Sequence, residues 1–414
     1  MVAIAEPVTG AVWKERLILS LLFLFPLAGA CVKHWLGTIF TVLFLIGLWD
    51  LVRGRGRPPL FTAERVWLSL CVAFLLSFFL SAVINGWSED QRHALGVEIR
   101  YLALVPLYLL VRRYPRGALY LLSGSVFAAF VMAVQSYYDV FSLMKERAEG
   151  AYSPNLLGPL AALSVMFAVS IWALLPRLRW MILAAVPAGL WSVAMSGSRG
   201  AYFGLIAMGM VWALLYFRRW QRPVMLVVVL LIPVTAYLSV GAVQQRVDGA
   251  VHDVAEYFSH TRSENQTDGA ETAAIRFEMW RAALLVFRDA PVFGIGTRNY
   301  TQGVQKYVDS GQVNPAAAHH GHPHDAYFDV LMSRGLTGFV IFLGVLFYPL
   351  YYFLKTFQRS PHSAMAGILL ITGFAMFSVT DASTFNKGNF LSFYLLFQAV
   401  LLSWHAGQVH REAG

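Results

Sequence analysis

The sequence contains the stretch Ala318-His319-His320-Gly321-His322-Pro323-His324-Asp325. It lies near the end of a polar interval, residues 241–335, that interrupts an otherwise apolar chain. On either side of the interval lie apolar segments about 20 residues long, the length at which an α-helix crosses the hydrocarbon core of a bilayer. The interval itself is charged, amphipathic and punctuated by Gly and Pro. We therefore divide the chain into three parts: membrane helices over residues 1–241, a large loop with the expected catalytic residues over 242–335, and membrane helices with a C-terminal tail over 336–414.

Composition places the chain among helical membrane proteins. The 414 residues are 57% hydrophobic and only 13% charged, with a mean hydropathy of +0.57, which excludes a soluble globular protein. The apolar segments are continuous and lack the alternation of a β-barrel. Cys31 and Cys71 both lie in apolar segments, which excludes a disulfide framework. The net charge of +9 is attributed to loop arginines and an anionic-substrate site, so no nucleic acid is expected as a partner.

Hydropathy predicts an all-α integral membrane protein of about twelve transmembrane helices, with amphipathic helices in its one large loop. The first helix is expected to be retained, because residues 1–9 lack a cleavable signal pattern. The predicted spans are residues 13–32, 35–52, 64–84, 93–112, 117–139, 155–175, 178–195, 200–217, 223–241, 336–356, 363–381 and 388–405.

Positive residues in the short connections predict the orientation. Every second connection is rich in Arg or Lys, and the alternate ones are mixed or acidic. The basic connections contain Arg53, Arg55 and Arg57; Arg112, Arg113 and Arg116; Arg177 and Arg179; Arg218, Arg219 and Arg222; and Lys355 and Arg359. By the positive-inside rule both termini are cytoplasmic and the large loop lies on the outer side of the membrane. ATP and nucleotide sugars, which are cytosolic, are therefore out of its reach.

Periodicity predicts two helices in the first part of the large loop, separated by a polar and mobile segment over residues 259–271. The first is an amphipathic helix on the membrane surface, with the stripe Val243, Val247, Val251, Val254 and Phe258. The second has the stripe Ile275, Met279, Ala283 and Phe287, and Pro291 ends it.

The second part of the loop is less regular. Residues 293–300 predict a turn that opens into a short helix. Residues 308–321 are rich in Gly, Ala and Pro, and we expect a loose segment suited to act as a lid. A helix resumes at His324 and enters the bilayer at Leu336, with Tyr327 toward the core.

Several charges lie where a bundle of apolar helices disfavours them. Glu98 and Arg100 fall inside the fourth predicted span, where ions usually pair with each other or line a wet cavity. A local structural pair and a functional role are equally good explanations of these two. Four further charges flank outer connections, and each alone is typical of a solvated side chain: Asp139, Arg147, Asp381 and Lys387.

Residues 196–200, Ser-Gly-Ser-Arg-Gly, join the seventh and eighth spans on the outer side. Small residues allow two helices to approach closely, and a helix start beside Arg199 presents N–H groups and a guanidinium to an anion such as a diphosphate. A tight turn with an interfacial Arg is the alternative. Arg276 in the large loop is likewise either a ligand for an anion or a surface charge.

The four histidines of the closing stretch are a poor match to a metal site. They lie in a sequence broken by Gly and Pro, without a regular i,i+4 pair or a nearby Cys, so neither a metal nor another cofactor is expected. A single His acting as a general base fits better, because its pKa lies near ambient pH. His324, at the start of the returning helix, is the best placed.

Taken in order, these motifs resemble the lipopolysaccharide O-antigen ligase family, within the O-antigen ligase/polymerase superfamily. The motifs are Ser196-Gly-Ser-Arg-Gly200, Arg276-Phe-Glu-Met-Trp280, Pro291-Val-Phe-Gly-Ile-Gly296 with Asn299-Tyr300, His324-x-x-Tyr327, and Arg334-Gly-Leu-x-Gly338. The resemblance implies a fold like that of multi-spanning (GT-C-like) glycosyltransferases. The resemblance in topology extends over the whole chain, and the motifs that carry it lie between residues 196 and 338.

The resemblance implies an enzyme of the bacterial inner membrane with its active site facing the periplasm. Such ligases transfer polysaccharide from an undecaprenyl-diphosphate-linked O-antigen to a hydroxyl of lipid A–core, without a metal and with inversion. Arg199 and Arg276 match the essential arginines of the family and His324 its essential histidine. The expected substrate-binding residues are Arg100, Arg147, Tyr327, Asp325 and Lys387, and the expected partners are the donor, the acceptor and membrane lipids.

One departure from the family pattern is Asp325, where relatives often have Asn or Ser. A carboxylate there either orients the imidazole of His324 or caps the following helix. Three other activities compete with the ligase assignment. An O-antigen polymerase and a protein O-oligosaccharyltransferase would differ only in the acceptor, although the single large outer loop favours a ligase. A lipid flippase or transporter would instead show paired halves with broken helices and ions at mid-depth, which the spans lack.

Overall fold

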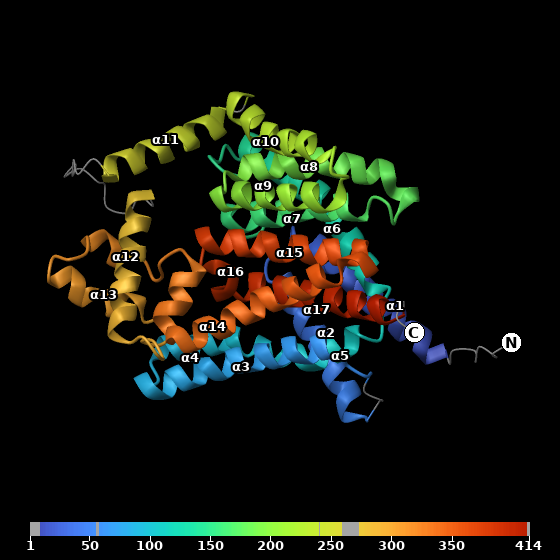
Figure 1. The fold of residues 1–414 in the computed structure, drawn as a ribbon, viewed down its shortest axis with the longest axis horizontal. Helices are drawn as coiled ribbons and strands as arrows, with labels where there is room; N and C mark the ends of the chain where they lie inside the picture. The colour runs from blue at the N-terminus through green and yellow to red at the C-terminus, as the bar shows by residue number, and fades with distance from the viewer. Residues whose placement is uncertain (1–8, 55–57, 240, 259–272, 412–414) are drawn as a thin grey trace.

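The computed structural model describes residues 9–54, 58–239, 241–258 and 273–411, and this part of the chain contains helices and no strand (Figure 1). Eleven of the described helical segments are long and apolar enough to cross a membrane. They confirm the prediction of an all-α, multi-spanning membrane protein. The segments are α2 (Trp35–Val52), α3 (Thr62–Asn85), α4 with α5 (Glu89–Glu98, Arg100–Val111), α6 (Gly117–Tyr137), α7 (Pro154–Ile171), α8 (Arg179–Ser196), α9 (Arg199–Tyr216), α10 (Arg222–Ser239), α14 (Ala326–Lys355), α15 (Pro361–Thr380) and α17 (Gly388–Arg411).

The first helix, α1 (Thr9–Gly29), is not among the eleven, although a span was predicted there. Its first half contains Lys14, Glu15 and Arg16, which lower its apolar character. The helix nevertheless packs along α6 and α2, and it buries Ile18 and Leu22 in the core of the bundle. Each of the other eleven predicted spans overlaps one of the eleven candidate segments.

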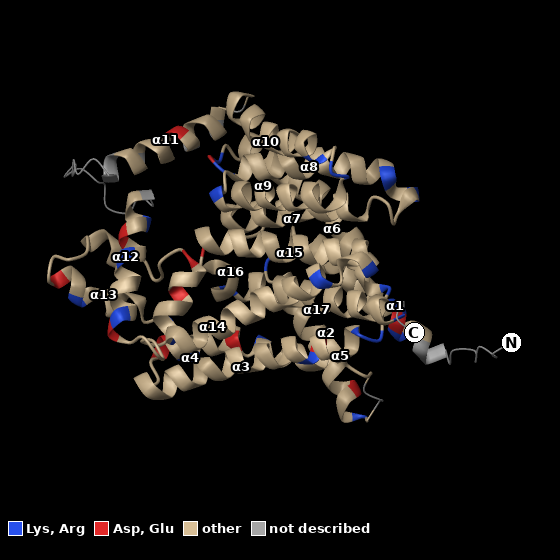
Figure 2. Ribbon diagram, in the orientation of Figure 1, with Lys and Arg blue, Asp and Glu red and all other residues tan. Residues whose placement is uncertain are grey.

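The bundle has a protected centre and an exposed edge. α17 and α7 lie at the centre and are buried over most of their length, because neighbours surround them on all sides. α10 packs mainly along α9 and α11 (Gly241–Phe258), and Val229 is its one buried residue. Charged residues gather toward the ends of the bundle and on the extramembrane helices, and the helix middles are largely uncharged (Figure 2). An edge helix that is apolar on every face is the pattern expected of a helix in contact with lipid.

α14 is broken at Gly335, whose backbone has a positive φ of 62°. The preceding loop segment runs alongside the break and supplies hydrogen-bond partners to the backbone there. The N–H of Ile295 donates to Met332 O at 3.1 Å, and the N–H of Leu336 donates to Pro291 O at 2.8 Å. A Cβ on Gly335 would come within 2.4 Å of the Val292 backbone, so only Gly fits. The Pro291–Gly296 and Arg334–Gly338 motifs therefore bind each other.

The large loop forms a small packed unit at the end of the bundle away from the start of α1 and the end of α17 (Figure 1). It consists of α11, α12 (Ala273–Asp289), α13 (Tyr300–Asp309) and a short 3₁₀ helix (Pro315–His319). The buried face of α12 includes Ile275, Met279 and Ala283, as the periodicity predicted, but Val286 is buried there and Phe287 is only half-buried. The segment expected to be polar and mobile, residues 259–271, lies outside the described residues.

The segment over residues 308–321, expected to be loose, is packed around Val313 and Ala317, and its role as a lid stays a prediction. Val313 and Ala317 are buried in the same cluster as the apolar face of α12. The Tyr300 hydroxyl donates a hydrogen bond to Ala317 O at 3.2 Å. Composition alone misled the prediction, because Gly, Ala and Pro are frequent in mobile loops but also allow close packing of a tight helical turn.

Candidate active site

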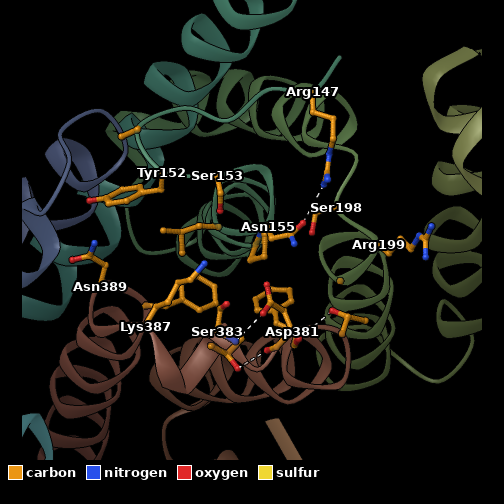
Figure 3. A pocket seen from close by; sticks show the side chains of 18 of the residues that line it. Arg147, Tyr152, Ser153, Asn155, Ser198, Arg199, Asp381, Ser383, Lys387 and Asn389 are labelled. Carbon is orange, nitrogen blue, oxygen red and sulfur yellow. Dashed lines mark hydrogen bonds between the residues drawn. The ribbon is translucent and has the colours of Figure 1, made fainter. Parts of the chain in front are cut away.

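A cavity of about 500 Å³ lies at the end of the bundle that carries the large loop. Its walls come from the α1–α2 junction, the connection before α7, the α8–α9 turn, α12, and the connection between α15 and α17 (Figure 3). Among the described residues that line it, five are Lys or Arg and one is acidic, so its charge is strongly positive. The cations are Lys33, Arg147, Arg199, Arg276 and Lys387, and the acid is Asp381.

Small residues build the wall around the α8–α9 turn. Gly197 ends α8 with a positive φ of 57°, and α9 begins at Arg199. A Cβ on Gly200 would lie 2.2 Å from Thr380 Oγ1, and a Cβ on Gly158 would lie 2.4 Å from Ser196 Oγ. Glycine thus allows α9 to start directly against α15 and α7. This close approach is what the Ser-Gly-Ser-Arg-Gly motif predicted.

Two helices begin at the cavity without a side-chain cap. Ser198 is the N-cap of α9 and Ser153 is the N-cap of α7, and neither side chain makes the usual capping hydrogen bond. Both serines line the cavity. Helix N-termini present backbone N–H groups and the positive end of the helix dipole, which favour an anion.

Hydrogen bonds hold two of the arginines in the wall. Arg276 Nη1 donates to Thr380 O at 2.9 Å, at the end of α15. Arg147 Nε donates to Ser196 O at 2.8 Å, and its Nη2 donates to Asn155 Oδ1 at 3.1 Å. In Figure 3, Arg147 points toward Ser198, whereas the Arg199 side chain extends away from Ser383 and Lys387. The cavity thus brings together four residues that the sequence singled out: Arg147, Arg199, Arg276 and Lys387.

Arg100 and Glu98 do not form the local pair that was one of their two explanations. Glu98 forms a buried ion pair with Arg334, far away in the sequence. Arg100 donates to Gly96 O and, through Nε, to Ser392 Oγ at 3.0 Å. It lies behind the cavity wall, where a Cβ on Gly388 would come within 2.6 Å of its Nη2. Arg100 is not among the residues that line the cavity.

His324 lies beside the cavity, close to Asp381, the acidic residue of the cavity wall. The ligating atoms of His324, His322 and Asp381 all lie within 4.8 Å of one another. His324 has a positive φ of 53°, and its backbone N–H donates to His322 Nδ1 at 3.2 Å. Trp280 of α12 donates to Pro323 O at 3.1 Å and so fixes the loop. The fold therefore places an imidazole next to a carboxylate at the rim of a cationic cavity.

Asp325 is a helix cap. Its Oδ1 accepts the Phe328 N–H at 2.9 Å at the start of α14, which matches the second of the two roles that the sequence left open. Burial raises the pKa of Asp325 to about 7, although hydrogen bonds from the backbone N–H groups of Phe328 and Tyr327 act in the opposite direction. The Tyr327 hydroxyl donates to Ala375 O at 3.0 Å, so this side chain links α14 to α15. Neither Asp325 nor Tyr327 lines the cavity.

Sequence reasoning missed two features of the site. Lys33 lies in the wall, although it was seen only as part of a short junction between the first two spans. Asp381 was interpreted as a solvated flanking charge, but it lies against His324 and its Oδ1 accepts the Ser383 N–H at 2.8 Å. The sequence placed both residues on predicted outer connections. It does not specify which of these connections lie side by side in the fold.

Comparison with known proteins bears on the identity of this region. The chain is 24% identical over 373 residues to an uncharacterized protein of Haemophilus influenzae, a match that covers 85% of this chain and 90% of the relative. Residues 184–343 match the family model described as O-antigen ligase. This segment includes the α8–α9 turn, Arg276, His324 and the break in α14. The resemblance to the O-antigen ligase family that the motifs predicted is thereby confirmed over residues 184–343.

Proposed function

We propose that this protein is an O-antigen ligase, which transfers polysaccharide from undecaprenyl diphosphate to a hydroxyl of lipid A–core without a metal and with inversion. The observation that carries the proposal is the cavity itself. Five cations from five separate segments surround two uncapped helix N-termini, and an imidazole–carboxylate pair lies at the rim. This is a site for an anionic leaving group next to a base.

The connections that form the cavity support a periplasmic site in the bacterial inner membrane. The bundle segments of its walls come from the connections that the positive-inside rule places outside. The Arg-rich connections, such as the one with Arg112 and Arg113, belong to the opposite set, so both termini are cytoplasmic in this proposal. A lipid diphosphate suits the periplasm because its leaving group already carries the activation that ATP would otherwise supply.

In the proposed reaction, the arginines hold the diphosphate. Arg276 is one main ligand and Arg199 is the other, once its side chain turns inward from the start of α9; Arg147 and Lys387 add charge from the same wall. Negative charge grows on the diphosphate as the bond to the anomeric carbon breaks. Fixed guanidinium groups and helix N-termini stabilise that charge and take the place of a divalent metal. Arg100 supports the α17 side of the wall from behind.

His324 acts as the general base in this proposal. The acceptor hydroxyl oxygen attacks the anomeric carbon from the side opposite the diphosphate, which inverts the configuration. A ring nitrogen of His324 takes the hydroxyl proton, and the departing diphosphate takes the bonding electrons. The carboxylate of Asp381 stabilises the imidazolium that forms. Asp325 and Tyr327 hold the start of α14 and so position His324.

Complementation of a strain that lacks its own ligase tests the proposal. We expect laddered O-antigen on lipopolysaccharide gels with the wild type and bare core with His324→Ala at equal membrane expression. The matched control is His319→Ala, an exposed histidine of the same stretch, which we expect to give ladders. If the wild type lengthened the undecaprenyl-linked chains and left the core bare, the protein would be a polymerase and the ligase proposal would be wrong.

A further inference from the structure

The group formed by His322, His324 and Asp381 offers ligands for a metal ion, which the proposed transfer reaction does not require. Three potential ligand atoms, two imidazole nitrogens and one carboxylate oxygen, lie within 4.8 Å of one another. They come from two elements that are distant in sequence, the loop before α14 and the end of α15. A third imidazole is close, since the His320 ring centroid lies 5.3 Å from that of His324.

We propose that this group is an inhibitory site for a borderline transition-metal ion such as Zn²⁺. Two nitrogen donors and one oxygen donor suit Zn²⁺ or Co²⁺ and not Mg²⁺ or Ca²⁺, which take oxygen ligands. Around a tetrahedral Zn²⁺ with bonds of about 2.0–2.1 Å, donor atoms lie about 3.4 Å apart. Because the three donor atoms lie within 4.8 Å of one another, rotations of the side chains suffice to bring them to this spacing.

The surroundings explain why the ion inhibits and is not a resident cofactor. His322 Nδ1 accepts the His324 N–H, so one hydrogen bond or one tautomer must change before His322 ligates through either nitrogen. The cations of the cavity also repel a divalent ion. The oxygen ligand is better prepared, because the Ser383 N–H already orients Asp381. The metal-free form is therefore the working state, and the ion binds when its concentration rises.

Binding of the ion would remove the base. A ring nitrogen of His324 that ligates Zn²⁺ has no lone pair for the proton of an acceptor hydroxyl, and Asp381 is occupied in the same event. This inhibitory consequence rests on the proposed function, whereas the binding itself does not. Zn²⁺ is thus expected to lower transfer by competing for the imidazole and not by displacing the diphosphate.

The test uses the full-length protein in detergent after treatment with a chelator. Co²⁺ is titrated first, and its visible absorption bands report a site with nitrogen ligands; Zn²⁺ is then added to displace it. We expect the wild type and His319→Ala to show the bands. His322→Ala should bind Co²⁺ about 10–100-fold more weakly, the range known for the loss of even a supporting partner of a metal ligand.

The transfer assay with added Zn²⁺ completes the test. We expect Zn²⁺ to inhibit the wild type and His319→Ala, whereas His322→Ala should resist inhibition when its rate with Zn²⁺ is compared with its own metal-free rate. Should His322→Ala fail to elute as a single species, His322→Gln replaces it, because the amide oxygen still accepts the His324 N–H. Equal Co²⁺ binding by wild type and His322→Ala, or equal inhibition of both, would overturn the site. Co²⁺ binding that depends on His322 in a protein without transfer activity would leave the site standing and refute the ligase.

Discussion

Two regions of the molecule hold charge away from bulk water, and they differ in how that charge is balanced. Between α4 and α14, Glu98 faces Arg334, and both side chains are almost completely buried. In the cavity, five cations face the single carboxylate of Asp381 among the described lining residues. The two regions therefore differ in the balance of charge: the buried ion pair is neutral as a unit, whereas the proposed anion site has an excess of cations.

The Glu98–Arg334 region is satisfied from several sides. Arg334 Nη1 donates to Phe74 O at 3.0 Å, and its guanidinium lies 4.0 Å from the centroid of the Phe74 ring. Nearby, Asp329 accepts a hydrogen bond from Asn386 at 2.8 Å. Because a buried pair gains little beyond its desolvation cost but is expensive to break, this region is expected to matter for folding. The cavity is expected to matter for binding and catalysis.

The largest effect is expected in the cavity region, from loss of the proposed base. His324→Ala should lower transfer in vitro by about 10²–10⁴-fold, the range for a positioned general acid or base. The melting temperature should change little, because His324 is only half-buried. The measurement is the initial rate with purified donor and acceptor, alongside thermal unfolding. A variant with a near-normal rate would remove His324 from the mechanism.

The second prediction concerns the balanced pair. Glu98→Ala leaves the Arg334 guanidinium buried without its carboxylate, which should cost about 3–5 kcal/mol of folding free energy. Thermal unfolding monitored by size exclusion measures the loss, and Glu89→Gln, an exposed change on the same helix, is the control. The double variant Glu98→Gln/Arg334→Met should regain part of the stability. An unchanged melting temperature in Glu98→Ala would show that the buried ion pair does not matter for folding, and the expected difference between the two regions would be wrong.

The third prediction tests the unbalanced cations. Arg276→Ala should lower transfer by about 10²–10³-fold, the loss typical of one donor to a transition-state charge. Undecaprenyl diphosphate should raise the melting temperature of the wild type, and by less in this variant, because ligand binding stabilises the folded state. Arg281→Ala is the matched control, since Arg281 is exposed on the same helix and contacts Glu278 at 3.7 Å. Equal losses of transfer activity in Arg276→Ala and Arg281→Ala would argue against a specific anion site at Arg276.

The smallest effect is expected from the cap of α14. Because the pKa of Asp325 is raised to about 7, the folded protein binds its proton more tightly than the unfolded chain does. The stability from the protonated carboxyl is present below about pH 4 and is lost as the pH rises through 7. Between pH 6 and 8 the loss should be about 1 kcal/mol. Asp325→Asn keeps a capping oxygen and does not titrate, so its melting temperature should vary less over this range; an identical pH dependence would contradict the assignment.

The sequence by itself determined the membrane helices, the large loop between them and the candidate residues of single motifs, because each of these depends on local properties. A helix must be apolar over about 20 residues to cross a bilayer, and the α8–α9 turn needs small residues wherever it packs. The motifs singled out Arg199 and Arg276, the family resemblance added Arg147 and Lys387, and the structure gathers all four in one cavity.

Only the tertiary structure decided which of these residues meet. It paired Glu98 with Arg334 and not with its neighbour Arg100, brought Asp381 to His324, and packed Val313 and Ala317 against α12. Hydropathy carries no information about such partners, because the helices of a bundle share the same apolar composition. Their order in space is set by packing between distant segments, as where Gly200 allows α9 to approach Thr380.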